Sequence, residues 1–555
     1  MPPKKSFCTP FELKTITMKT FRSLCTFFLL SSFLLTSTLC FAQTSYVWDG
    51  SSSTAWATAA NWTPSGVPAG SDDVTIVSAG NNPILSGNAS VKSLTITSGT
   101  LDLNGFTLSL NKNLILSGGS AEDGLIELNT GSQANLDNVI LDCELNVTAA
   151  TLNIDNCTFN QEVTFEKTGS GSDYLGGNKY LAQANFINNS YTLSGLMLGW
   201  NANDTIMAGL YLENHAKSFL LGHKSNGNKV VFAGSGNQQL EITGTYSVSA
   251  YRADVNKPSG ELLLDGTLYV SKVLILTNGI LEAENGLIYF NSGATVSGTS
   301  DSSYIDGAVE KRGNQAFTFP VGKNGHYRPI SISAPSSTSS GFRAEYFEYD
   351  SDPIHAHSSK DGSIAEISRN EHWNLERTSG TSNVNVTLSW DSLSTSCGFD
   401  DKADLLVTAW NGSQWKNLGN GGVAGNDVKG TVITSAASTF YGLYTLATTD
   451  EFVCARGGSC SYATCNLVGN GDFETAINCG PIGQGSVSLN CWERLGWEPS
   501  AEVFVRGCTT GGGTYNVGTN TFGSSPPSDT HTTEHPMIIS WAFMRILNGT
   551  FLIFP

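Results

Sequence analysis

The residue types best suited to bind a metal ion gather between residues 350 and 362, in the sequence DSDPIHAHSSKDG. On an extended strand, His355 and His357 would face the same side, with Asp352 and two further aspartates nearby. Imidazole nitrogens and carboxylate oxygens are common ligands of divalent metals. The spacing predicts a metal site at His355, His357 and Asp352. A solvated loop that follows Tyr349 explains the same residues equally well, so both interpretations stay open.

Catalytic motifs are missing from the sequence. It contains no G-x-S-x-G, no H-E-x-x-H, no phosphate-binding loop and no dinucleotide fingerprint. His223 and Lys224, in LGHKSNG, have no neighbouring pair of carboxylates, and Asp72 and Asp73 precede the first regular strand. We therefore predict that the protein is not an enzyme and uses no cofactor.

Composition indicates an exported, all-β protein. Only 14% of the 555 residues are charged, against roughly a quarter in an ordinary soluble domain, and 59 are glycine. The formal net charge of −18 makes nucleic acid an unsuitable partner. A length of 555 residues predicts several domains rather than one core.

The first 42 residues have the features of a targeting leader. A basic segment, Met18–Arg22, precedes an apolar stretch from Leu24 to Leu39 and a small-residue cleavage site that ends at Ala42. The sequence predicts that maturation exposes Gln43. We expect the mature protein to be secreted or held at the outer cell surface, without a stable membrane span.

A ladder of short apolar pairs follows the leader. Leu101/Leu103, Leu108/Leu110 and Leu114/Leu116 alternate with polar residues and recur about every seven positions, punctuated by glycines. LNKNLILSGG at residues 110–119 returns as VSKVLILTNG at residues 270–279. Strands this short gain stability by stacking on equivalents in neighbouring turns. Residues 43–313 are therefore predicted to form one right-handed parallel β-helix of roughly ten coils, with on the order of twenty-odd residues each.

The start of this ladder carries three tryptophans close together: Trp48, Trp56 and Trp62. Because the end of a solenoid exposes apolar core, these indoles are expected to cap the first coil. Stacking on a sugar is the alternative use of such rings. Within the ladder, Cys143 and Cys157 are separated by an even number of positions from leucines and phenylalanines that are expected to point inward. The alternation therefore predicts that both thiols also point inward.

Longer strands separated by Gly, Asn and Ser turns replace the ladder over residues 314–449. Six or seven strands in about 130 residues are typical of an antiparallel β-sandwich. Trp390, Trp410 and Trp415 are predicted to pack in its core or along its edges.

The opening pattern W-x-G, S-x-x-W, N-W, G-x-P and D-x-V-x-I, together with the later segment SYIDGAVEKRGNQAFTFPVGKNGHYRPISIS, resembles large β-helical surface proteins of Bacteroidota that are cargo of type IX secretion. In the second segment, the junction between helix and sandwich is marked by Gly307, Lys311, Phe319–Gly322 and Tyr327–Pro329. The resemblance covers the greater part of the chain and implies an architecture rather than a catalytic activity.

A cysteine-rich linker, residues 450–466, leads to the C-terminal segment, residues 467–555. Six cysteines gather there and are candidates for disulfides of unknown connectivity: Cys454, Cys460, Cys465, Cys479, Cys491 and Cys508. CNLVGNGDFETAINC resembles the first strand of galactose-binding-like jelly rolls, which implies a structural Ca²⁺ at Glu474. Too few residues follow for a whole jelly roll, so we expect this module to be incomplete through truncation or a frameshift.

Three function classes remain at this stage. The first is a secreted or surface-attached, adhesin-like structural protein that presents binding modules on a rigid rod, with glycans or other cell-surface polymers as partners. The second is a glycan-binding protein that acts through its C-terminal module. The third is a β-helical polysaccharide lyase or hydrolase, a class in which acidic residues cluster on one outward sheet.

Overall fold

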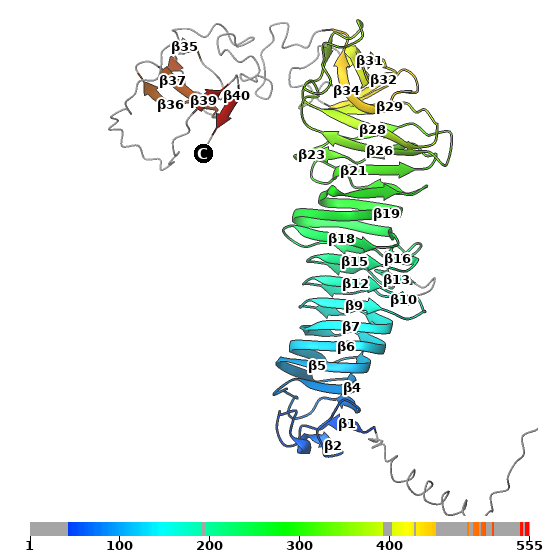
Figure 1. Cartoon of the computed structure of the whole chain (residues 1–555), viewed down its shortest axis with the longest axis vertical. Coiled ribbons are helices and arrows are strands. Elements are labelled where there is room, and N and C mark those ends of the chain that lie inside the picture. The colour runs from blue at the N-terminus through cyan, green and yellow to red at the C-terminus, as the bar shows by residue number, and fades with distance from the viewer. Residues whose placement is uncertain are drawn as a thin grey trace, which may run out of the picture.

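The structure is a computed structural model that describes residues 43–190, 195–391, 402–426 and 429–450, together with a few short strands further along the chain. The residues of these four ranges form a long rod of stacked strands (Figure 1). In these ranges only two short 3-10 helices, η1 (Ala59–Asn61) and η2 (Lys402–Asp404), accompany the strands and loops. No helix in this part of the chain is long and apolar enough to cross a membrane. The all-β class predicted from the sequence is confirmed.

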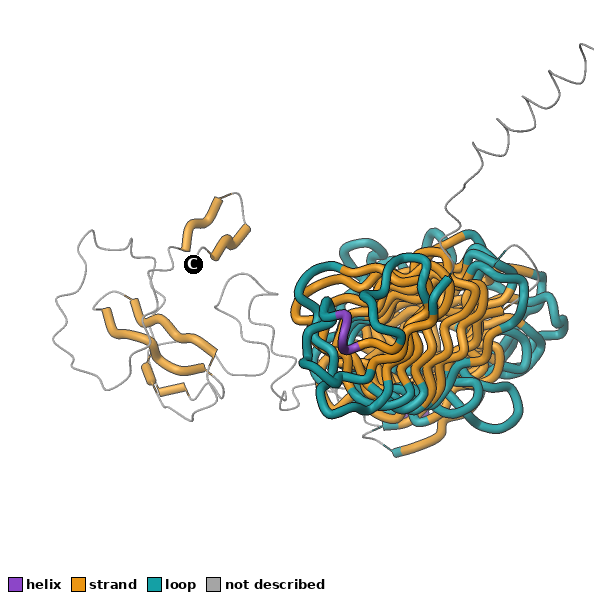
Figure 2. Tube along the Cα trace, turned by 90° about the horizontal axis from the view of Figure 1, so that it is seen from below, coloured by secondary structure: helices purple, strands orange, loops and turns teal. Residues whose placement is uncertain are grey.

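A parallel β-helix of about 11 turns makes up the longer part of the rod. Strands of successive coils pair in parallel, as Leu114 does with Leu94 and Ala134, whereas β2 pairs antiparallel with β1 at the N-terminal end. Figure 2 shows the strands superposed when the rod is viewed from one end, with loops around them. The strands of this part are β1 (Ser45–Trp48), β2 (Trp62–Thr63), β3 (Asp73–Ile76), β4 (Ala89–Ile96), β5 (Thr100–Leu116), β6 (Ser120–Asp137), β7 (Ile140–Asp155), β8 (Thr158–Phe159), β9 (Val163–Lys167), β10 (Asp173–Tyr174), β11 (Lys179–Tyr180), β12 (Ala184–Asn188), β13 (Gly195–Leu198), β14 (Asp204–Ile206), β15 (Leu210–Asn214), β16 (Ser218–Leu221), β17 (Val230–Phe232), β18 (Gln238–Gly244), β19 (Val248–Phe290), β20 (Thr295–Ser297) and β21 (Ile305–Arg312).

The repeated apolar pairs line the inside of the helix. Leu114, Leu116, Leu274 and Leu276 are all buried, whereas Ile115 and Ile275 between them point outward and are partly exposed. Leu274 pairs in parallel with Val296 of the next coil. The prediction that the two matching blocks occupy inward positions of one continuous helix is confirmed.

Both cysteines of the ladder are buried and unpaired, as expected from their parity. Burial raises the pKa of the Cys143 thiol to about 12 and that of the Cys157 thiol to about 11. Since the thiolate is the reactive form, both residues act as small apolar side chains of the core.

The coils lengthen towards the middle of the helix. The register pairs Val147 with Phe165 in the earlier coils, whereas further along it pairs Phe186 with Leu212 and then Leu212 with Ile242. The number of residues between a position and its partner in the next coil is therefore larger in each of these three pairs than in the one before. The inward positions stay aligned through this change, so the additional residues form loops on the outside of the rod.

The three N-terminal tryptophans close the first coil. Trp48, Trp56 and Trp62 are each at most 3% exposed, and the Trp62 ring lies edge-on to both others, at 4.9 Å from Trp48 and 4.7 Å from Trp56. The Trp62 indole N–H donates to the Trp56 carbonyl at 2.8 Å, which satisfies its polar atom inside the cap. Buried in this way at the first coil, the three rings offer no face to a sugar.

The helix runs into the sandwich without a linker. β21 pairs in parallel with β19 along the last coil and antiparallel with β26 (Gly341–Phe347) of the sandwich. One hydrogen-bonded sheet therefore continues from the solenoid into the next domain. The boundary predicted at residue 313 falls at the end of β21, a strand that belongs to both parts.

Two antiparallel sheets form the sandwich between residues 314 and 449. The first sheet continues from β21 in the order β26, β28, β34, β30, β31, and β27 also pairs with β34. The second sheet has the order β22, β25, β29, β33, β32. The remaining bounds are β22 (Phe317–Phe319), β23 (Gly322–Lys323), β24 (His326–Tyr327), β25 (Ile330–Ile332), β27 (Glu366–Ile367), β28 (His372–Ser379), β29 (Val386–Trp390), β30 (Leu405–Trp410), β31 (Trp415–Asn417), β32 (Gly422–Gly425), β33 (Gly430–Ile433) and β34 (Gly442–Thr448). Trp390 and Trp415 are buried and Trp410 is partly buried, as predicted.

Beyond residue 450 the described residues are those of short antiparallel strand pairs: β35 (Ser486–Val487) with β38 (Gly513–Thr514), β36 (Trp492–Glu498) with β37 (Ala501–Arg506), and β39 (Met544–Leu547) with β40 (Thr550–Ile553).

Candidate functional site

Three ring side chains form an aromatic strip on one flank of the solenoid: Tyr174, Trp200 and His223. They come from β10 and from the loops that follow β13 and β16, which lie above one another along the rod (Figure 1). The ring centroids lie 5.3 Å apart for Tyr174 and Trp200, and 4.1 Å apart for Trp200 and His223. Tyr174 is 43% exposed, and the other two rings are partly exposed.

The strip follows from the register of the coils. Leu198 pairs with Leu221, and Trp200 and His223 each lie two positions further on, so they occupy equivalent positions in successive coils. The residues between, Gly199 and Gly222, have φ values of 64° and 73°, a left-handed conformation that favours glycine. These glycines turn the chain outward immediately before each ring.

Hydrogen bonds fix the loops that carry the rings. The Asn228 side chain donates to the Trp200 carbonyl at 2.8 Å, and the Asn201 side chain donates to the Tyr174 carbonyl at 2.7 Å. His223 Nδ1 accepts the backbone N–H of Ser225 at 2.9 Å. These bonds hold the backbone at Tyr174 and Trp200 and the imidazole ring of His223.

Three cationic side chains lie near the His223 end of the strip in an otherwise acidic protein. Lys224 is exposed in the same loop as His223, and Lys272 donates its Nζ to the Lys224 carbonyl at 2.6 Å. Arg252 follows Ala250, the partner of Leu221 in the next coil, by two positions. Among the described residues, no acid lies within 4.0 Å of these three cations, whereas nearby Lys229 pairs with Asp254.

A buried acid lies behind the strip. Asp204 accepts the backbone N–H of Gly199 at 2.6 Å and that of Asn178 at 2.8 Å. Burial raises the pKa of its carboxyl to about 7 in spite of these hydrogen bonds. The side chain thus joins the corner of one coil to that of the coil below.

Asp204 should make the stability of the solenoid depend on pH. An aspartate in the unfolded chain titrates near pH 3.9, so between about pH 4 and pH 7 the folded state holds a proton that the unfolded state has lost. We expect the free energy of unfolding to fall as pH rises through this window, by up to about 1.4 kcal/mol per pH unit from this group. Urea unfolding of the wild type and of Asp204→Asn at several pH values measures the slope. Equal slopes for the two proteins would contradict the assignment.

The predicted metal residues lie on turns between β26 and β27 rather than on an extended strand. His357 Nδ1 is 3.7 Å from an Asp352 carboxylate oxygen, while the His355 ring packs 4.8 Å from the Trp410 ring. Across residues 43–450, leaving out the undescribed gaps, no group of three or more His, Cys, Asp or Glu side chains could hold a metal ion. Metal binding by His355, His357 and Asp352 stays a prediction.

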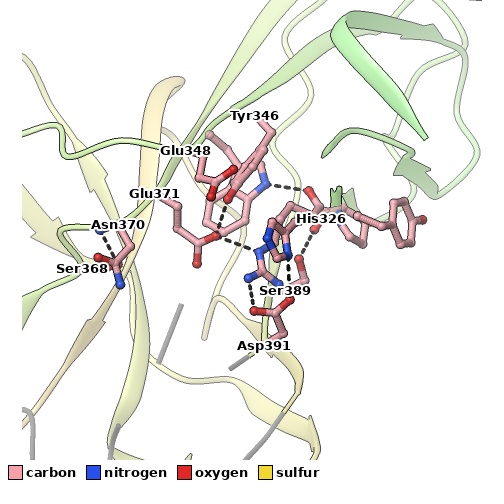
Figure 3. Close-up of polar contacts among 12 residues, drawn as sticks. His326, Tyr346, Glu348, Ser368, Asn370, Glu371, Ser389 and Asp391 are labelled. Carbon is pink, nitrogen blue, oxygen red and sulfur yellow. Dashed lines mark hydrogen bonds and ion pairs between the residues drawn. The ribbon is translucent and has the colours of Figure 1, made fainter. Parts of the chain in front are cut away.

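A charged network inside the sandwich involves residues that the sequence analysis did not connect. The Arg328 guanidinium lies 3.0 Å from Glu371 and also contacts Asp391, and Arg328 and Glu371 are each 1% exposed. The Tyr346 hydroxyl donates to Glu371 at 2.9 Å (Figure 3). Burial opposes the charge, but the two carboxylates raise the pKa of Arg328 above its ordinary value. The network joins the start of the sandwich to its middle strands, with Arg328 and Glu371 buried at its centre and Asp391 22% exposed.

Several predicted features lie outside the described residues. They are the leader, residues 1–42, the Ca²⁺ candidate Glu474, and the disulfide candidates Cys454, Cys460, Cys465, Cys479, Cys491 and Cys508. They stay predictions.

Residues 47–141 match a family model described as a domain of unknown function, DUF8693. The match covers the tryptophan cap and the first coils, and it ends before the coils that carry the aromatic strip. No curated protein and no solved structure matches the chain significantly.

Sequence reasoning noticed His223 and Lys224 but missed Tyr174 and Trp200 as their neighbours. The signal was present: Leu-Gly-Trp at residues 198–200 recurs as Leu-Gly-His at residues 221–223. This repeat has the period of one local coil, which the shorter coils near the N-terminus do not predict.

Proposed function

We propose that this protein is a secreted or cell-surface, adhesin-like structural protein whose β-helix holds binding modules away from the cell. The observation that carries the proposal is the continuous sheet from solenoid to sandwich, through β21 and β26. A junction made of paired strands fixes the orientation of the sandwich relative to the solenoid, whereas a flexible linker would not. The capped, unbranched rod therefore has the properties of a spacer.

A structural role is also supported by the use of the acids near the N-terminus. Asp72 accepts the backbone N–H groups of Thr44 at 3.1 Å and Ala69 at 2.9 Å, so its carboxylate holds the cap together. We propose on this basis that the protein is not a polysaccharide lyase or hydrolase. The resemblance of the cap and of the junction to surface proteins of Bacteroidota supports export to the cell exterior.

The cellular location of the protein distinguishes this proposal from an intracellular role. An antibody raised against residues 43–450 should label intact cells of the organism that encodes the chain, and external protease should degrade the antigen. N-terminal sequencing of the mature protein should begin at Gln43. Recovery of the protein from the cell interior with its leader intact would contradict the proposal.

A further inference from the structure

We propose that the aromatic strip and the cations around it bind an anionic polysaccharide, along the flank of the solenoid formed by the corners of three successive coils. This binding site goes beyond the spacer role, and it is separate from the C-terminal module. It makes the rod itself a ligand-binding element.

The strip offers a sugar chain partly exposed aromatic rings whose planes are inclined by 44° between Tyr174 and Trp200 and by 61° between Trp200 and His223. Pyranose rings present flat C–H faces that stack on aromatic side chains, and the partly exposed Trp200 ring lies between Tyr174 and His223. Asn201 borders the rings, and its amide nitrogen already donates to Asp155 and to the Tyr174 carbonyl, so its exposed side-chain oxygen is the atom that can accept a hydrogen bond from a sugar hydroxyl. Because the three rings follow one another along the rod axis, the site fits an extended chain better than a compact ligand.

Charge selects an anionic chain over a neutral one. The protein carries a formal net charge of −18, so an anionic ligand is repelled by most of the surface. Around the strip, Lys224, Arg252 and Lys272 have no described acid within 4.0 Å, which leaves their charges available to carboxylates of uronic acids. Local attraction within a repulsive surface favours binding at this flank alone.

A second pair of rings on the same solenoid provides a matched control. Tyr269 and Tyr289 lie outward on successive coils with ring centroids 5.0 Å apart, a geometry close to that of Tyr174 and Trp200. Tyr289, however, pairs with Glu310 of the next coil, which carries the opposite charge to Lys224. The nearby Arg343 is paired with Glu310 at 2.8 Å, so this aromatic pair has no unpaired cation beside it and should not bind an anionic chain.

The test is calorimetric titration of the full chain with alginate oligosaccharides, and with neutral cello-oligosaccharides of the same length. We expect binding of alginate that weakens about tenfold in Trp200→Ala and is unchanged in Tyr289→Ala. Lys224→Glu and Lys272→Glu, at exposed positions, should weaken it about threefold to tenfold at low salt, with less effect at high salt. Circular dichroism checks that each variant is folded.

Three results would overturn the proposal. The first is failure of the wild type to bind alginate, and the second is equal affinity for the neutral oligosaccharide. The third is a folded Lys224→Glu variant with unchanged affinity at low salt, a readout that remains valid even where Trp200→Ala does not fold. A negative result leaves the spacer role untouched, because cell-surface labelling tests that role separately.

Discussion

Leu274→Asp is expected to destabilise the solenoid by about 3 to 5 kcal/mol. Leu274 is 1% exposed and lies inside a coil that packs against Val296 of the next. A carboxylate at this position would lose its hydration without gaining a partner. Since each coil is stabilised mainly by its neighbours, the loss should open the surrounding coils before the distant cap.

Urea unfolding of the full chain, followed by far-ultraviolet circular dichroism, measures this effect. Ile275→Asp is the matched control, because the same side chain is introduced one position along the same strand, at a residue that points outward. The control should cost about 1 kcal/mol or less. Similar losses in the two variants would show that Leu274 does not face the core.

The architecture could be predicted because its repeating unit is local. The alternating pattern around Leu114 and Leu116 predicts within a few residues that both side chains point inward. The same sequence pattern recurs at Leu274 and Leu276. The cap could be predicted for a similar reason, since Trp48 and its two partners occur together at the start of the ladder. Coil lengths could not, because only the pairing of Leu212 with Ile242 reveals where the longer loops are inserted.

Features that depend on pairing between strands far apart in the sequence could not be predicted from the sequence pattern. The strand β21 was recognised as the end of the solenoid, but its antiparallel pairing with β26 spans a connection that no periodicity describes. The aromatic strip is a similar case, since Tyr174 comes from β10 while Trp200 and His223 come from later coils. The sequence shows the types of these residues, but only the register of the paired strands shows that they lie next to one another.

Arg328 is the clearest example of a residue whose importance comes from packing. The sequence marks it as part of the junction motif Tyr327–Pro329, whereas the structure buries its guanidinium between Glu371 and Asp391. Its backbone carbonyl accepts the Trp373 indole N–H at 2.9 Å, which ties the same segment to the sandwich core. A buried ion pair contributes little net stability when complete, but removal of one partner is costly.

Arg328→Met should therefore reduce the free energy of unfolding of the sandwich by about 3 to 5 kcal/mol, because the Glu371 carboxylate stays buried without its guanidinium. Arg343→Met is the milder comparison: Arg343 lies 2.8 Å from Glu310 and is 40% exposed, and Glu310 keeps a hydrogen bond from Thr378, so this loss should be smaller than that in Arg328→Met. Adding Glu371→Gln to Arg328→Met removes the stranded charge while Tyr346 can still donate to the amide oxygen. The double variant should recover part of the loss in thermal or urea unfolding. If it is instead less stable than Arg328→Met alone, the cost of the single change lies in lost packing of the arginine side chain and not in the unpaired carboxylate.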